Sequence, residues 1–311
     1  MLSDAPFEVP PYLLEKADGV AQIPMAIAGA DNEIALESAR QATEAGLIKP
    51  VLVGDGDIIR SLADVIDWDV RYFDIIEAGT EEEACEKSVA LAAEGRVKAL
   101  MKGHVHSDVL MRAVLKKDAG LRTKRRISHV FHMTIPGRER VLLITDGAVN
   151  VAPNVETKMD IVRNAVDLSK MLGTATPKVA MLSGTETVNA SMPSTIDAEE
   201  VVRRASEGEI TGCIIDGPFA FDNALSPDAA KLKGISGPVA GNADIVVVPN
   251  IETGNGLFKM MVYFMSGLAA GIVLGAKVPI VLTSRADPPE ARFAASILAA
   301  VVANESVRRG A

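Results

Sequence analysis

The sequence predicts an α/β fold of two domains, each built as three layers with a mainly parallel sheet between helices. Short apolar strands alternate with helices along the chain, and repeated βα units form parallel sheets that helices cover on both faces. The chain has 311 residues, more than one small core organises, so two domains are expected. Its residues are 48% hydrophobic and 4% aromatic, which is typical of a soluble enzyme rich in Ala, Val, Ile and Leu.

The first part of the chain is predicted to form four βα units after a loose N-terminal tail. Gly46 ends the first helix, because glycine is favoured just after helix C-termini. Thr80 caps the third helix, whose first turn is acidic. The expected strands are 23–30, 49–55, 71–78 and 98–103, and the expected helices are 31–46, 57–66, 80–95 and 107–117.

The pattern changes after about residue 124, where two paired strands are expected around a Pro136-Gly137 turn. We therefore predict a domain boundary near 130–137. The expected elements beyond it are helix 156–172, strand 177–183, helix 197–206, strand 211–216, strand 243–249, helix 255–272 and strand 278–283, followed by a terminal helix.

One uncharged segment, residues 260–275, requires comparison with a membrane span. It is shorter than the roughly 20 residues that cross a bilayer. We predict a buried helix instead, and no membrane association. Gly267, Gly271 and Gly275 would then form a stripe that allows another helix or subunit to approach closely.

The net charge of −9 argues against a nucleic-acid partner, although lysines and arginines outnumber acids between residues 96 and 140. This basic segment is either a solvated face or an electrostatic funnel for a small polyanion. It lacks the interleaved aromatic residues on which bases stack, which argues further against nucleic acid.

Cysteine and histidine usage predicts a cytoplasmic protein without a metal. Two cysteines are too few for a disulfide framework, and the first residues contain acids and prolines where a secretory leader would be apolar. The four histidines lie within a short, cation-rich segment that would repel a metal ion, so we expect partly exposed polar side chains and no metal site. They are His104, His106, His129 and His132.

Several predicted strands end in loops of similar composition. These loops contain small hydroxyls, Asp-Gly or Gly-Asn turns and one or two cations, which suits phosphate and carbonyl oxygens. Ligands of parallel sheets bind beyond the carboxyl ends of strands. Taken singly, each loop could equally be an ordinary turn. The loops are 102–108, 145–154, 216–224, 249–259 and 283–287, and neither a P-loop nor a GxGxxG motif accompanies them.

Taken together, four ordered blocks resemble the phosphate acetyltransferase and phosphate butyryltransferase family. They are HSDVLMRAVL (106–115), DGPFAFDNALSPDAAKLKGISGPVAGNADI (216–245), ADIVVVPNIETGNGLFKMMVYF (243–264) and AGIVLGAKVPIVLTSRAD (270–287). The PNIETGN and LTSRAD wording is closer to the butyryl branch. The resemblance extends from about residue 22 to the end of the chain.

This resemblance implies reversible transfer of an acyl group between coenzyme A and inorganic phosphate. It also implies the two-domain architecture of isocitrate and isopropylmalate dehydrogenases, with the active site in the interdomain cleft. The first domain would comprise residues 1–135 plus 275–311, and the second residues 136–274. The family implies a homodimer that uses acyl-CoA, phosphate and acyl phosphate as substrates and has no tightly bound cofactor.

The matching blocks also imply roles for individual residues. Ser284 would donate to the oxyanion or phosphate, and Arg285 would hold phosphate or the coenzyme A diphosphate bidentately. Further candidates for binding phosphate or coenzyme A are Ser107, Arg112, Asp216, Asn255, Lys259 and Glu290.

The base that would deprotonate the thiol is left open by a departure from the family pattern. In the acetyl branch an aspartate lies seven positions after the serine, and here that position is Ala291. Asp287 and Glu290 are the nearby carboxylates. We prefer Asp287 because it is nearer the strand end, whereas Glu290 could equally be a first-turn helix acid.

Two alternative functions are distinguishable from an acyltransferase. An NAD-dependent hydroxy-acid dehydrogenase on the same fold would need aspartates spaced for a divalent metal, and no such spacing is present. A non-catalytic sensor would bind coenzyme A or phosphate in the same cleft without turnover, and would release no thiol.

Overall fold

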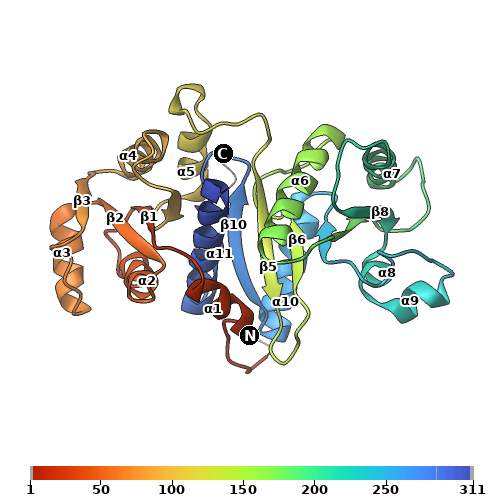
Figure 1. Ribbon diagram of the computed structural model, residues 1–311, viewed down its shortest axis with the longest axis horizontal. Helices are drawn as coiled ribbons and strands as arrows, with labels where there is room; N and C mark the ends of the chain where they lie inside the picture. The colour runs from red at the N-terminus through yellow and green to blue at the C-terminus, as the bar shows by residue number, and fades with distance from the viewer. Residues whose placement is uncertain (1–2, 285, 309–311) are drawn as a thin grey trace. The chain divides into compact units, whose positions relative to one another are not determined.

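A computed structural model describes residues 3–284 and 286–308, which form two compact units (Figure 1). We name them the N-terminal unit, residues 7–125 with 270–308, and the central unit, residues 126–269 with 3–6. From the sequence, the corresponding domain limits were expected after residues 135 and 274, whereas the two units divide after residues 125 and 269. That the units act as domains around a cleft stays a prediction.

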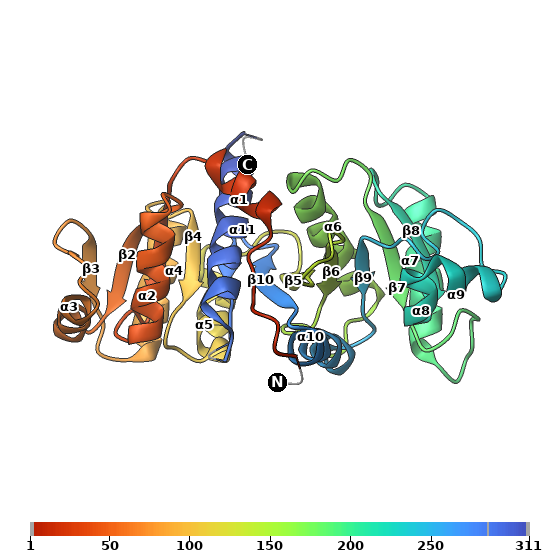
Figure 2. The same ribbon diagram turned by 90° about the horizontal axis from the view of Figure 1, so that it is seen from below.

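The N-terminal unit is a three-layer α/β sandwich. Its strands follow the order β3-β2-β1-β4-β11-β10, in which only β10 is antiparallel to its neighbour. Helices α2 and α11 pack side by side on one face and α4 and α5 on the other (Figure 2). The strands are β1 (Ile23–Ala28), β2 (Ile48–Gly54), β3 (Asp74–Glu77), β4 (Ala99–Lys102), β10 (Leu268–Leu274) and β11 (Ile280–Val281).

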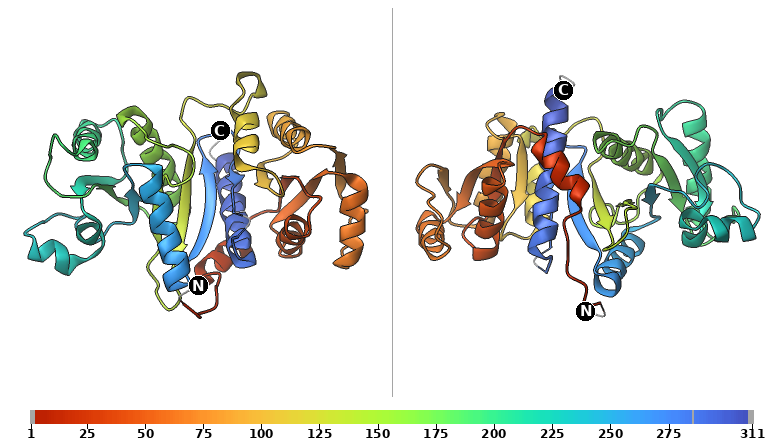
Figure 3. Two further views of the ribbon diagram at one scale, coloured as in Figure 1. Left: turned by 180° about the vertical axis from the view of Figure 1, so that it is seen from behind. Right: turned by 60° about the horizontal axis from the view of Figure 1, so that its bottom comes forward.

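The helices of this unit begin where the sequence places capping residues. The side chain of Asn32 accepts from two amides of α2, Asp55 does so for α3, and Thr80 accepts from the Glu83 amide at 3.2 Å. The helices are α1 (Pro11–Asp18), α2 (Glu33–Glu44), α3 (Gly56–Val65), α4 (Glu81–Ala93), α5 (Ser107–Leu115) and α11 (Pro289–Arg308), with a 3₁₀ turn at Lys117–Ala119. Helix α1 forms where a loose tail was expected, because Leu13 is fully buried and α1 packs on α11 (Figure 3, right).

The central unit is a second α/β sheet with strand order β5-β6-β9-β7-β8. Strands β5 and β6 form the predicted antiparallel pair, and the other neighbours are parallel. Its strands are β5 (Ser128–Thr134), β6 (Leu142–Thr145), β7 (Lys178–Leu182), β8 (Ile214–Phe219) and β9 (Ile245–Val247). Its helices are α6 (Val155–Met171), α7 (Pro193–Ser206), α8 (Phe221–Leu225), α9 (Pro227–Leu232) and α10 (Ile251–Met265).

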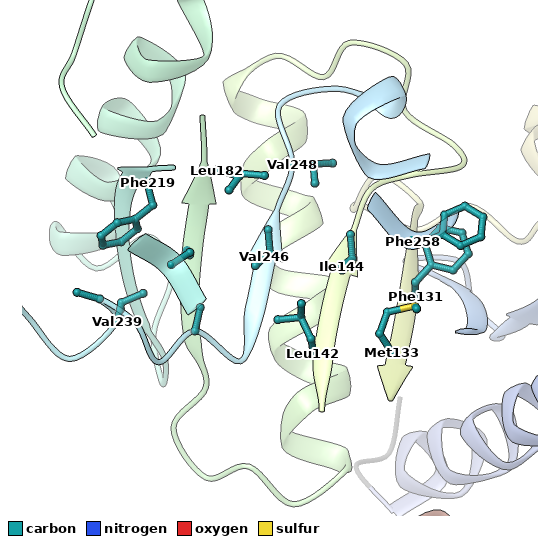
Figure 4. Packing of buried hydrophobic residues seen from close by; sticks show 14 of the residues in the cluster. Phe131, Met133, Leu142, Ile144, Leu182, Phe219, Val239, Val246, Val248 and Phe258 are labelled. Atoms are coloured by element: carbon teal, nitrogen blue, oxygen red, sulfur yellow. The ribbon is translucent and has the colours of Figure 1, made fainter. Parts of the chain in front are cut away.

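The core of the central unit lies between this sheet and helices α8–α10 (Figure 4). Phe258 of α10 stacks on Phe131 of β5, with ring centroids 3.9 Å apart and planes inclined by 22°. Val246 and Ile144 extend the same apolar surface along β9 and β6. This packing fixes α10 across the β5–β6 pair (Figure 3, left).

The predicted helix 255–272 is wrong in its second half, which forms strand β10. Helix α10 ends at Met265 because Ser266 adopts a left-handed conformation with φ of 47°. The Gly267 amide then donates to the Met261 carbonyl at 3.0 Å, which closes the helix end. Every residue of β10 is buried, so its uniform apolar run resembles a buried helix in sequence. Gly271 therefore lies in a strand, and the expected glycine stripe is absent from α10. Among the described helices, none is both long and apolar enough to cross a membrane.

Candidate active site

A cavity of about 130 Å³ opens at the carboxyl edge of the N-terminal unit's sheet. Strands β4 and β11 are parallel neighbours, with Met101 opposite Val281, so the residues that follow both strands leave the sheet together. Helices α2 and α11 complete the wall. The lining residues are Asn32, Ile34, Ala35 and Ser38 from α2 and its cap, Met101–His104 after β4, Thr283 and Ser284 after β11, and Arg292 of α11.

Two glycines bring the loops after β1 and β4 into contact at this edge. A Cβ atom at Gly103 would collide with the carbonyl oxygen of Gly29, and Gly29 itself has φ of +74°. The Gly103 and His104 amides donate to the carbonyls of Ala28 and Gly29, both at 2.8 Å. The loop after β4 therefore has a defined course, and only glycine allows the close approach.

Lys102 ends β4 and is only 7% exposed. Its Nζ donates to the carbonyl oxygens of Val105 at 3.1 Å and Gly103 at 3.3 Å, which ties the side chain to the loop that it precedes. Arg292 lies in the early turns of α11 and is half-buried. Burial lowers the pKa of Arg292 below its ordinary value, and the nearby Asp287 carboxylate opposes that shift. Among the described residues, the cavity lining thus includes two cationic ones.

The SRAD stretch forms a tight turn that joins β11 to α11. The Asp287 carboxylate accepts from the backbone amide of Ser284 at 2.6 Å, and the Ser284 Oγ accepts from the Ala286 amide at 3.3 Å. Ser284 is exposed and Asp287 and Glu290 are half-buried. Arg285, predicted to bind phosphate, lies outside the described residues. The turn places the candidate serine at the cavity with a carboxylate hydrogen-bonded to its backbone.

The other predicted residues of this unit lie on α5. Ser107 is its first residue and is exposed. Arg112 is exposed and pairs with Asp108 at 2.9 Å, an i,i+4 surface pair of the kind that contributes little to stability. Neither residue lines the cavity. Their part in binding stays a prediction.

The remaining predicted residues belong to the central unit. Asn255 and Lys259 lie on α10, which begins at Ile251, four residues before the predicted helix start at 255. Asp216 lies inside β8, whereas the sequence placed it after the strand; its carboxylate accepts from the Gly217 amide at 2.8 Å. These side chains are half-buried or exposed, and all three come from a different unit than Ser284.

One residue that the sequence missed organises the central unit's predicted loop 145–154. Asp146 is almost fully buried, and its carboxylate accepts from the amides of Ala148, Val149, Asn150 and His129 at 2.9–3.2 Å. A Cβ atom at Gly147 would lie 2.9 Å from the Gly254 backbone, so this loop presses on the first turn of α10. Asp146 is therefore a structural anchor beside Asn255.

The expectation of four partly exposed histidines is wrong for two of them. His129 and His132 are buried in β5, because both faces of this strand are covered and alternation does not bring its polar residues to solvent. His104 is exposed, as is His106, whose Nδ1 lies 2.9 Å from Glu81. Within the described residues, no three potential ligands come together as a metal site.

Lys102 and Arg292 are cationic residues of the cavity lining that sequence reasoning did not select as site residues. Lys102 stands in the strand-end loop 102–108 that was singled out, directly after the apolar run Ala99–Met101, and a lysine ending a buried strand is a signal that could have identified it. Arg292 is separated from Ser284 by a turn and the start of a helix. Only the packing of α11 beside α2 brings it to the cavity.

Hydroxyls and cations at the carboxyl ends of parallel strands define the class of α/β proteins that bind a small anionic ligand at a sheet edge. The family model described as phosphate acetyl/butaryl transferase matches residues 80–300. A phosphate acetyltransferase of Rickettsia prowazekii is 45% identical over 94% of this chain and 84% of its own length. A phosphate butyryltransferase of Clostridium acetobutylicum is 42% identical over 90% of this chain and 93% of its own.

A solved structure agrees with these relatives. The branched-chain phosphotransacylase from Enterococcus faecalis V583 is 30% identical, has a TM-score of 0.78, and the match covers 91% of this chain and 99% of that one. The chain belongs to the phosphate acetyl/butyryl transferase family. Its acetyl and butyryl relatives have similar identities, so these identities do not select an acyl chain.

Proposed function

We propose that this protein is a phosphate acyltransferase that transfers an acyl group reversibly between coenzyme A and inorganic phosphate. The observation that carries the proposal is the strand-end cavity, where the Ser284 turn meets two cationic lining residues. An acyl phosphate carries its negative charge beside the carbonyl that reacts. A site with hydroxyl donors and cations suits both parts of that substrate.

The chemistry we propose is direct attack in a ternary complex, without a covalent enzyme intermediate. The thiolate of coenzyme A forms a C–S bond to the carbonyl carbon of the acyl phosphate, and the C–O bond to phosphate breaks in the same overall step. Inorganic phosphate leaves with the electron pair of that bond. Ser284 donates to the developing oxyanion or the phosphate, and Arg285 holds phosphate oxygens.

A thiol in water has a pKa of about 8.5, so a base or nearby cations must favour the thiolate at neutral pH. We propose Asp287 as that base, with Glu290 as the alternative. The 2.6 Å bond to the Ser284 amide orients the Asp287 carboxylate at the turn. Ser107, Arg112, Asp216, Asn255 and Lys259 are proposed to bind the phosphate and coenzyme A parts of the substrates.

Phosphate-dependent release of free thiol tests this function. The protein is incubated without added metal with acetyl-, propionyl- and butyryl-CoA, and a thiol-reactive dye reports coenzyme A. We expect release that requires phosphate, and kcat/KM to rank the three acyl groups. Binding of coenzyme A without thiol release from any of them would favour the sensor.

We also propose that the protein acts in the cytoplasm as a homodimer, and that α10 is its contact surface. Phe258 packs inward, whereas Met260 and Phe264 are 59% and 55% exposed elsewhere on the helix. A helix that is hydrophobic all round is normally buried. Beside α10 lies an apolar cavity of about 300 Å³, whose lining includes Met261 and Met265.

A second copy is the occupant that suits both features. In a two-fold interface the same patch occurs on each copy, so a helix that offers exposed apolar anchors beside an apolar cavity can complement itself. Sedimentation velocity at micromolar concentration should give a dimer, and Phe264→Glu should give a monomer. Tyr72→Glu, at an 80% exposed aromatic of the N-terminal unit, is the control and should remain dimeric. A wild-type monomer at every concentration would contradict this surface.

A further inference from the structure

We propose that Asp146 is a positioning residue for the acyl transfer, and that it acts through Asn255 in the first turns of α10. This role rests on the proposed function, in which Asn255 binds a phosphate or coenzyme A part of the substrates. It identifies what fixes that side chain in the central unit. Three features support it: the donors around the Asp146 carboxylate, the contacts between its loop and α10, and the place of Asn255 on that helix.

The carboxylate of Asp146 is surrounded by uncharged N–H donors, and the residue is only 2% exposed. One oxygen accepts from the Ala148 and Val149 amides at 2.9 and 3.0 Å. The other accepts from the backbone and side-chain amides of Asn150 at 3.2 and 2.7 Å, and from the His129 amide of β5 at 3.2 Å. A buried charge is costly unless hydrogen bonds satisfy it. These bonds satisfy the carboxylate and tie its loop to β5.

Asparagine would fit the space of Asp146 but would not replace its hydrogen bonds. An ionised carboxylate accepts at both oxygens, whereas a carboxamide has one oxygen and an NH₂ group that only donates. Both oxygens of Asp146 face N–H groups. Asp146→Asn therefore leaves buried donors without an acceptor and releases the loop without creating a cavity.

The loop that Asp146 holds is in contact with the backbone at the start of α10. The Ile251 amide donates to the Val151 carbonyl at 2.9 Å. A Cβ atom at Gly147 would lie 2.9 Å from the Gly254 carbonyl carbon and 3.2 Å from the backbone nitrogen of Asn255. Because these contacts are made by backbone atoms, a shift of the loop moves the start of the helix with it.

Asn255 lies between two points at which α10 is held. Gly254 meets the loop, and Phe258, four residues later on the same side of the helix, stacks on Phe131 (Figure 4). Asn255 shares the neighbouring face with Lys259, the other predicted substrate-binding residue of this helix. Asn255 is half-buried and Lys259 is exposed. A displaced first turn therefore moves Asn255, while the aromatic stack holds the next turn in place.

Steady-state kinetics of Asp146→Asn, Asn255→Ala and the double variant test this role, with acyl-CoA and phosphate varied in turn. A misplacement of about 1 Å can cost about 100-fold in rate, so we expect Asp146→Asn to lower kcat/KM about 10- to 100-fold. In the Asn255→Ala background the same substitution should change kcat/KM by less than about twofold, because the side chain through which Asp146 acts is absent. Equal effects in the two backgrounds would overturn the positioning role.

Asp244→Asn is the matched control. Asp244 is a half-buried carboxylate of the same unit and accepts from the Lys178 amide at 2.8 Å. It lies directly before β9, whereas Asp146 follows β6, the parallel neighbour of β9, so the two carboxylates lie at opposite edges of the sheet. The control should be less stable in urea and keep the wild-type kcat/KM. A loss of kcat/KM as large as that of Asp146→Asn would overturn the positioning role, because lowered stability would explain both.

Gly147→Ala keeps the carboxylate and is a second variant where Asp146→Asn fails to fold. Its methyl group is placed against the backbone of Gly254 and Asn255, so it should lower kcat/KM in the same direction. Amide hydrogen exchange, followed by mass spectrometry, should rise several-fold in the first turn of α10 in both variants and stay at the wild-type level there in Asp244→Asn. Wild-type exchange in this turn in Gly147→Ala would overturn the link between the loop and the helix.

The two levels of proposal fail differently. An active wild-type enzyme whose Asp146→Asn variant keeps its kcat/KM would overturn the positioning role alone. Wild-type kcat/KM in Asn255→Ala would overturn it too, because the side chain through which Asp146 is proposed to act would then have no part in the reaction. Absence of phosphate-dependent thiol release by the wild type would overturn the acyltransferase, and hydrogen exchange would still decide whether the loop of Asp146 positions the start of α10.

Discussion

Buried His132 makes the stability of the protein depend on pH in a defined window. Burial in β5 lowers the pKa of His132 to about 4, from 6.5 for an unperturbed imidazole. Between these values the unfolded chain binds a proton that the folded chain excludes. Stability is therefore intact above pH about 6.5 and falls as the pH drops, by about 1.4 kcal/mol per pH unit and to a total of about 3 kcal/mol near pH 4.

Urea unfolding at several pH values between 7.5 and 4.5 measures this effect. His132→Gln removes the titrating group, and although the variant is destabilised at every pH, its free energy of unfolding should fall less steeply with acidification than that of the wild type. His104→Gln, at an exposed histidine, is the matched control and should keep the wild-type slope. Equal slopes for His132→Gln and wild type would refute the reasoning, because other groups would then account for all of the pH dependence.

Three further predictions test the site and the packing. Asp287→Asn should lower kcat about 10²-fold or more at saturating substrates if this carboxylate is the base, whereas Glu290→Gln should stay near wild type; the reverse order would transfer the role. Buried Lys158 lies 2.6 Å from the Asp197 carboxylate, and Asp197→Asn leaves the ammonium without its ion pair. This substitution should lower the free energy of unfolding in urea by about 3–5 kcal/mol, more than Lys158→Met does, because Lys158→Met leaves no buried charge. Phe258→Ala should cost about 3–5 kcal/mol by opening the stack with Phe131, and a cost below about 1 kcal/mol would contradict that packing.

Much of the N-terminal unit is predictable because its local signals agree with its tertiary structure. Thr80 caps a helix in the sequence and in the structure, and the apolar runs around Ile27 and Val51 are buried parallel strands. The segment 255–272 is different. Apolar residues continue from α10 into β10, so periodicity does not reveal that Ser266 turns the chain and ends the helix.

The candidate site was predictable only where its residues lie close together along the chain. Ser284 and Asp287 occupy one turn, and the family resemblance of the LTSRAD block selected Ser284 with Asp287 as the nearby carboxylate. Lys102 and Arg292 meet the same cavity from β4 and α11, which are far apart along the chain. Their shared location depends on strand order and on helix packing, and neither property is a local property of the sequence.

Several described cations of the basic segment 96–140 take part in local structure. An anion site in this acidic chain therefore needs only a few cations placed at the site itself. Of the basic segment 96–140, Lys116 pairs with Glu86, and Arg140 donates to the carbonyls of Leu225 and Ala243 in the central unit. These cations are engaged in local structure, as is Arg112 with Asp108. This local pairing argues against the hypothesis that the whole basic segment acts as an electrostatic funnel for a small polyanion. For the proposed function, cations of lower exposure at the strand-end cavity matter more than the basic segment, because salt screens them less than it screens surface charges.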